Sequence, residues 1–194
     1  MKPIEASFFH QPTLQLAERL LGKYMVHEHS SGLLIGKIVE TEAYLGAEDR
    51  AAHSFANRRT KRTEVMFGEP GLIYTYQMHT HTLINVVAAP VDIPNAILIR
   101  ALEPIEGMDL MKQFRNNLPM KQWTNGPGKL TKAMAISMEY YGKHWSEKPL
   151  YIAEGEEVTS ISIGPRIGIE NSGEAVHYPY RFWETNNPFV SKTR

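Results

Sequence analysis

A long extended segment at residues 33–44 constrains the fold more than any other part of the sequence, because it predicts a single long β-strand. Four further parts of the sequence share its extended character: a hairpin with arms at 72–77 and 82–87, an apolar strand at 96–102, and short strands at 158–163 and 166–169. The sequence therefore predicts a mixed, mostly antiparallel sheet.

Three segments have the apolar spacing of helices that pack on such a sheet, namely 13–22, 106–116 and 129–138. Thr13 is expected to cap the first of these helices, and Gly22 to end it. Residues 46–71 and 116–128 are loop-like by composition. No repeat, linker or low-complexity tract divides the chain, so we expect one α+β domain over residues 1–194.

Charge and cysteine content limit the classes of function. The sequence contains 21 Lys+Arg and 21 Asp+Glu, which excludes a uniformly basic nucleic-acid coat and leaves only a local patch. The absence of cysteine excludes a disulfide framework, a thiolate metal site and a cysteine nucleophile, and it fits a reducing compartment. No apolar run has the length of a membrane span, and no apolar block follows residues 1–5, so we expect a cytosolic protein.

One face of the long strand carries chemically active side chains. Because side chains alternate along a strand, Glu40, Glu42 and Tyr44 share a face. Such a face is either solvent-exposed or functional. Arg100 interrupts the apolar strand at 96–102, and a buried arginine needs a carboxylate, which either glutamate could supply. A carboxylate held ionised by arginine is a plausible general base, with His53 expected nearby.

A basic run lies in the loop at 46–71 and consists of Arg58, Arg59, Lys61 and Arg62. Such runs are most often solvated surface. The alternative is a phosphate-binding edge, to which Lys129 could add one more contact. Tyr74 and Tyr76 occupy one strand face, which is consistent with core packing or with stacking on a base.

His79 and His81 stand at alternate positions, which suggests a metal site with His53 or an acidic residue as the third ligand. The pair falls where a hairpin tip is expected, and no spaced acidic partner follows. A metal-dependent hydrolase is therefore kept as an alternative function.

Several separate motifs extend, in order, over nearly the whole chain: residues 39–46, Asp49, residues 52–54 and 66–71, Tyr74, Tyr76, and residues 85–86, 100–104, 126–130, 165–169 and 180–182. Together they resemble the alkyladenine (3-methyladenine) DNA glycosylase family, in its bacterial form. The resemblance implies a domain with a protruding β-hairpin. It also implies an enzyme that flips an alkylated, deaminated or etheno purine out of duplex DNA and hydrolyses the N-glycosidic bond, leaving an abasic site.

The resemblance implies roles for the residues that match the family's motifs. Glu42 corresponds to the general base that activates a water, and Arg100 to the residue that holds this carboxylate and the water. No lysine nucleophile corresponds, so the enzyme would be monofunctional, without strand cleavage. The resemblance implies neither a metal nor an organic cofactor. It implies a monomer that acts on double-stranded DNA.

The base-binding pocket follows from the same resemblance. Tyr44 would cover one face of the flipped purine, and His53 and Tyr76 the other. Asn85 corresponds to a residue that disfavours the exocyclic amine of normal guanine. The tyrosine π-faces would also favour a cationic base such as 3-methyladenine.

The tip of the hairpin departs from the family's pattern, because the tyrosine and glycine expected there are missing from residues 77–82. Counting forward from Tyr76 places the DNA wedge at His79, whereas counting back from Asn85 places it at Met78. We favour Met78, since apolar side chains are common wedges between base steps. The altered tip leaves a non-catalytic nucleic-acid-binding module as a further alternative.

Overall fold

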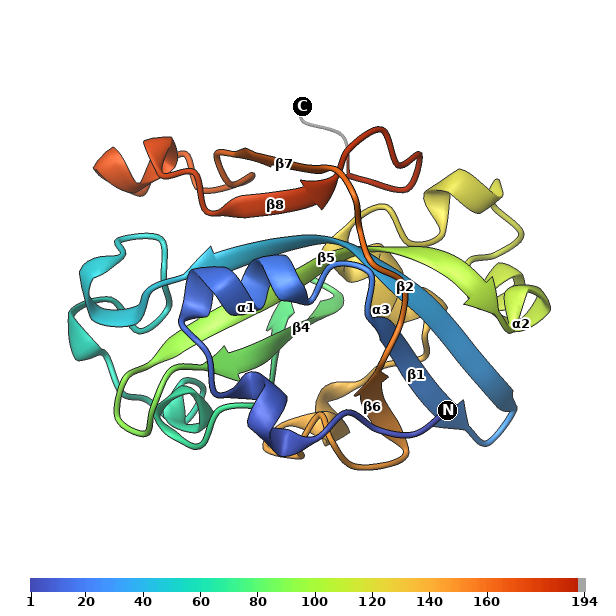
Figure 1. The fold of residues 1–194 in the computed structure, drawn as a ribbon, viewed down its shortest axis with the longest axis horizontal. Coiled ribbons are helices and arrows are strands. Elements are labelled where there is room, and N and C mark those ends of the chain that lie inside the picture. Colours follow the sequence, from blue (N-terminus) through green and yellow to red (C-terminus); the bar gives the residue numbers. More distant parts are fainter. Residues whose placement is uncertain (192–194) are drawn as a thin grey trace.

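The computed structural model describes residues 1–191, and an eight-stranded sheet forms its framework (Figure 1). Strand β2 (Gly32–Tyr44) is central: β5 (Asn95–Glu106) pairs with one edge, and β1 (Tyr24–His29) and β8 (Arg181–Glu184) pair with the other. The other strands are β3 (Ile73–Met78), β4 (His81–Ala88), β6 (Leu150–Ala153) and β7 (Ile161–Gly164). Their order is β3-β4-β5-β2-β1-β6, with β8 between β2 and β7.

In residues 1–191, three short α-helices accompany the sheet: α1 (Thr13–Arg19), α2 (Met108–Phe114) and α3 (Pro127–Ala133). Single turns of 3₁₀-helix occur at Ala6–Phe9, Gly46–Glu48, Phe55–Asn57, Glu64–Phe67, Met120–Gln122, Met138–Tyr140 and Gly173–His177. All strand pairings of residues 1–191 are antiparallel. The predicted α+β class and mostly antiparallel sheet are confirmed. None of the helices described for residues 1–191 has both the length and the apolar character to cross a membrane.

Alternation along the strands separates two apolar clusters. Ile97 and Ile99 on β5 face the main core, which includes Leu16 and Leu20 of α1. Leu98, on the opposite face of β5, belongs to a second cluster with the aromatic residues of β3. The second face of β3, β4 and β5 is therefore the one available to build a site.

Several local predictions differ from the structure. Thr13 is the first residue of α1 and makes no capping hydrogen bond; instead its Oγ1 accepts a hydrogen bond from the Asn95 side chain at 2.8 Å. The strand predicted at 166–169 is wrong, because the hydrogen bonds of this segment go to site residues and Gly168 has a φ of +78°. Strands β1, β6 and β8 were not predicted from the sequence.

Candidate active site

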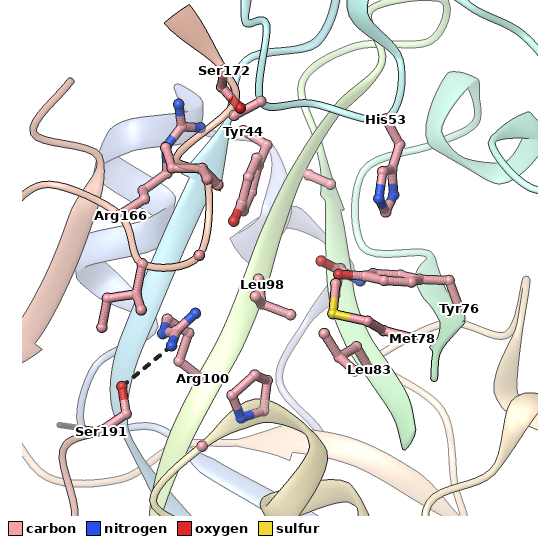
Figure 2. Close-up of a pocket in the computed structure, with 18 of the residues that line it drawn as sticks. Tyr44, His53, Tyr76, Met78, Leu83, Leu98, Arg100, Arg166, Ser172 and Ser191 are labelled. Atoms are coloured by element: carbon pink, nitrogen blue, oxygen red, sulfur yellow. Dashed lines mark hydrogen bonds between the residues drawn. The ribbon is translucent and has the colours of Figure 1, made fainter. Parts of the chain in front are cut away.

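A cavity of about 950 Å³ lies against the second face of β3, β4 and β5 (Figure 2). The residues of these strands that line it follow one another at every second position, as alternation along a strand predicts: Tyr74, Tyr76 and Met78 on β3, Leu83 and Asn85 on β4, and Ala96, Leu98 and Arg100 on β5. Tyr44, His53 and residues 166–172 complete the wall, together with residues 125–127, Lys129 and Ser191. The cavity thus brings together segments from most of the chain.

Glu42 is fully buried directly behind this wall. Its Oε2 accepts hydrogen bonds from the Tyr44 hydroxyl at 2.8 Å and from Arg100 Nη1 at 3.1 Å. Its Oε1 accepts one from the backbone N–H of Ile167 at 2.7 Å. A carboxylate has about four acceptor positions, so these three donors leave one position, on Oε1.

An irregularity in the pairing of β2 with β5 directs Arg100 toward this carboxylate. Glu40 pairs with Ala101 and Thr41 with Ile99, so Arg100 is an extra residue on β5. Bulges of this kind redirect side chains next to active sites. The Arg100 guanidinium consequently reaches both Glu42 and Glu40, at 3.1 Å each, and the predicted pairing of this arginine with a glutamate is confirmed for both.

Tyr44 forms one side of the cavity and is backed by a buried ion pair. The Arg166 guanidinium lies 4.6 Å from the centre of the Tyr44 ring and pairs with Asp49 in a bidentate contact. Burial and the nearby Glu42 carboxylate raise the pKa of Tyr44 well above its usual value. The phenol therefore stays protonated and donates to Glu42.

An aromatic group faces Tyr44 across the cavity (Figure 2). The rings of Tyr74 and Tyr76 stack with centroids 5.4 Å apart, and the His53 ring meets Tyr76 edge-on at 4.6 Å. His53 Nδ1 lies 2.8 Å from the Tyr74 hydroxyl. Burial, helped by Arg62 and Arg58, lowers the pKa of His53 to about 4, so the His53 ring carries no charge at neutral pH.

Asn85 is fixed in the floor of the cavity beside these rings. Its side-chain amide donates to the Tyr74 carbonyl at 2.9 Å, and its backbone carbonyl accepts from the Trp145 indole at 3.2 Å. Only 3% of Asn85 is exposed. Such a rigid amide can discriminate between ligands by their polar groups.

The hairpin formed by β3 and β4 ends in a two-residue turn, His79 and Thr80, because Met78 pairs with His81. Met78 shares the strand face of Tyr74 and Tyr76, lines the cavity, and is 46% exposed. His79 lies in the turn with a φ of +53°. The two wedge candidates therefore differ in position: Met78 lies at the rim of the cavity, and His79 at the tip.

The four cations of the basic run are all on the surface. Arg59 is held by Glu64 and Asp92 and packs over the Phe67 ring. Arg58, Lys61 and Arg62 form no ion pair with residues 1–191. Lys129 lines the cavity and donates to the Asn125 side chain at 2.9 Å; burial and then Arg115 lower its pKa.

The structure does not support the metal interpretation. In residues 1–191, no three His, Asp or Glu side chains come together as a ligand set, and His53 lies with the aromatic wall rather than with His79 and His81.

Comparison with known proteins agrees with this geometry. The family model described as "Methylpurine-DNA glycosylase (MPG)" matches residues 7–188. A protein of Bacillus velezensis is 61% identical over 98% of this chain and 97% of its own length, and one of Bacillus subtilis is 58% identical with the same coverage. Both are named "Putative 3-methyladenine DNA glycosylase". The chain belongs to the methylpurine-DNA glycosylase family.

Membership confirms the resemblance and the enzyme class: this methylpurine-DNA glycosylase is a monofunctional hydrolase of base-excision DNA repair. The structure brings Glu42, Arg100 and Tyr44 together, and it places His53, Tyr76 and Asn85 in the same cavity.

Further residues of the candidate site were not predicted from the sequence. Asp49 and Arg166 both fall within the family's motifs, but only the fold pairs them. Ile167 and Ser191 contact Glu42 and Glu40 through their backbone N–H groups. Backbone contacts leave no signal in residue type.

Proposed function

We propose that this glycosylase removes alkylated purines, 3-methyladenine among them, from double-stranded DNA as a monomer. The observation that carries the proposal is the position of Glu42: a buried carboxylate, held by Arg100 and Tyr44, behind one wall of a cavity whose opposite wall is aromatic. Both relatives compared above bear a name for that activity.

The cavity suits a base flipped out of the duplex. Flipping costs about a few kcal/mol, and stacking on aromatic rings returns roughly 1–3 kcal/mol per base. Tyr44 would stack on one face of the purine, and Tyr76 and His53 would contact the other. Because His53 is neutral at physiological pH, its ring does not repel a cationic alkylated base. Met78, at the rim, would fill the gap in the base stack.

Hydrolysis would proceed from the free acceptor position of Glu42. A water bound at Oε1 loses its proton to the carboxylate and attacks the anomeric carbon of the sugar. The N-glycosidic bond breaks, and its electron pair leaves with the base. A cationic alkylpurine becomes neutral as it departs, so little acid catalysis is needed. The products are the free base and an abasic site in an unbroken strand.

DNA outside the pocket would be held through its phosphates. Arg58, Lys61 and Arg62 form no ion pair with the described residues, and Arg62 lies 5.8 Å from the Tyr76 ring of the aromatic wall. Lys129 stands at another part of the rim. Arg59 would contribute less, because Glu64 and Asp92 neutralise it.

The test is release of free base from methylated duplex DNA, with chelator present. Wild-type protein should release base, and Glu42→Gln should nearly abolish release while still binding the DNA. Glu48→Gln, a change of the same kind on the exposed surface, is the matched control and should stay active. Full activity of Glu42→Gln would overturn the assigned role. Binding of the wild type without base release would instead favour the non-catalytic module.

A further inference from the structure

A second carboxylate, Glu40, is fully buried two residues before Glu42 and has no part in the hydrolysis described above. Four donors converge on it. Oε1 accepts from Arg100 Nε at 3.1 Å, Arg181 Nε at 2.6 Å and Ser191 Oγ at 2.7 Å. Oε2 accepts from the backbone N–H of Ser191 at 2.7 Å. Burial removes a carboxylate from water, and hydrogen bonds and ion pairs of this kind are needed to offset that desolvation cost.

These contacts fix the plane of the Arg100 guanidinium. Nε is bound to Glu40, Nη1 to Glu42, and Nη2 to the Ser191 hydroxyl at 3.4 Å. The last of these contacts is drawn in Figure 2, where Ser191 approaches Arg100 at the edge of the cavity. Arginine has a rigid planar fork, so a bond at Nε determines where both terminal nitrogens point.

Arg181 completes a cluster of two carboxylates and two guanidinium groups whose formal charges cancel. Its Nη2 donates to the Ser191 carbonyl at 3.2 Å, and its guanidinium stacks over the Trp183 ring at 4.4 Å. Ser191 is therefore held by hydrogen bonds through its N–H, its carbonyl and its hydroxyl. This ties the segment after β8 to the strand that carries the general base.

We propose that Glu40 and Ser191 are positioning residues for base excision: they orient Arg100 so that its Nη1 meets Glu42. The segment that follows β8 is thereby part of the active site, although it lies far from Glu42 in sequence. The inference rests on the proposed function, since it assigns the orientation of Arg100 to the same reaction.

The experiment measures single-turnover base release and DNA affinity separately. A hydrogen bond to a charged group is expected to change the rate by about tenfold to a hundredfold, so Glu40→Gln should slow release by that factor with little change in Kd. Ser191→Ala, which keeps every charge, should slow release less. Ser191→Thr keeps the hydroxyl and should restore the rate. Glu103→Gln, which removes a carboxylate paired with Lys37 elsewhere on the sheet, is the matched control.

A double-mutant cycle distinguishes positioning from a structural role. In an Arg100→Lys background, which has no Nε contact to Glu40, Ser191→Ala and Glu40→Gln should add little further loss. The same loss in both backgrounds, or a loss that follows a fall in thermal stability, would overturn the inference. Wild-type rates for Glu40→Gln and Ser191→Ala would also overturn it. If Glu42→Gln is inactive in that case, the proposed function still stands; if Glu42→Gln is active, the proposed function itself has failed.

Discussion

The backbone N–H of Ile167 donates to Oε1 of Glu42 at 2.7 Å, although 125 residues separate the two. Within residues 1–191 it is the sole donor to that oxygen, because Tyr44 and Arg100 both bind Oε2. The bond therefore determines which acceptor position of the carboxylate remains for water. It also places the loop after β7 directly against Glu42, the proposed general base.

Removing this donor should impair catalysis more than binding. Ile167→Pro lacks the N–H. A hydrogen bond to a charged group contributes about 1.5–3 kcal/mol, so its loss should lower the rate of base release roughly tenfold or more. Ile167→Ala keeps the N–H and is the control. Thermal stability should be measured alongside, and a folded Ile167→Pro protein with the wild-type rate would contradict the role of this bond.

The same loop shows why part of the site could not be predicted from sequence. Ile167 and Ile169 alternate as in a strand, yet their segment packs as a loop on Glu42. What was predictable followed from local alternation: the strand that places Glu40, Glu42 and Tyr44 on one face was correct, as was the hairpin. Long-range partners leave no such pattern, and the pairing of Asp49 with Arg166 spans 117 residues.

The resemblance supplied what pattern alone left open. From the residues, Tyr74 and Tyr76 were consistent with core packing or with base stacking. In the structure they belong to an apolar cluster and also line the cavity, so packing in the core does not remove them from the site. The bulge that directs Arg100 toward Glu42 depends on the register of two strands, which composition does not determine.

Met78 should be needed for excision from duplex DNA and dispensable on single strands. A wedge fills the space that a flipped base leaves, so Met78→Ala should lower the rate on a duplex by about tenfold, where unstacking costs a few kcal/mol. On a single-stranded substrate the variant should match the wild type. His79→Ala is the comparison: a larger duplex defect for that variant would assign the wedge to His79.

Arg58 and Lys61 should each contribute one unit to the salt dependence of DNA binding. Each phosphate contact changes the slope of log K against log salt by about one unit. Each of the single variants Arg58→Gln and Lys61→Gln should therefore flatten this slope by about one unit, and the double variant should flatten it by about two units. Arg59→Gln should change it less, because Glu64 and Asp92 already pair with Arg59. Lys2→Gln, at an exposed position beside Glu5, should leave the slope unchanged. Equal slopes for all variants would remove the basic run from the DNA interface.

His53 should make the folded protein less stable as the pH falls from about 6.5 to about 4. Burial, with Arg62 and Arg58, lowers its pKa to about 4 in the folded state, whereas an unfolded histidine takes up a proton near pH 6.5. Between these values the unfolded chain binds more protons, so acid favours unfolding. A shift of this size corresponds to an upper limit of roughly 3 kcal/mol.

Unfolding by denaturant at pH 7 and pH 4.5 tests this prediction. The free energy of unfolding of the wild type should fall between pH 7 and pH 4.5. That of His53→Gln should fall less, whatever its value at pH 7. His27, whose pKa burial also lowers, stays in both proteins and accounts for part of the remaining loss. His10→Gln, at an exposed position, should show the full wild-type loss. If His53→Gln loses as much stability as the wild type, burial in the wall that faces Tyr44 does not keep the His53 ring unprotonated. The neutrality of His53 could then no longer explain why this ring does not repel a cationic base.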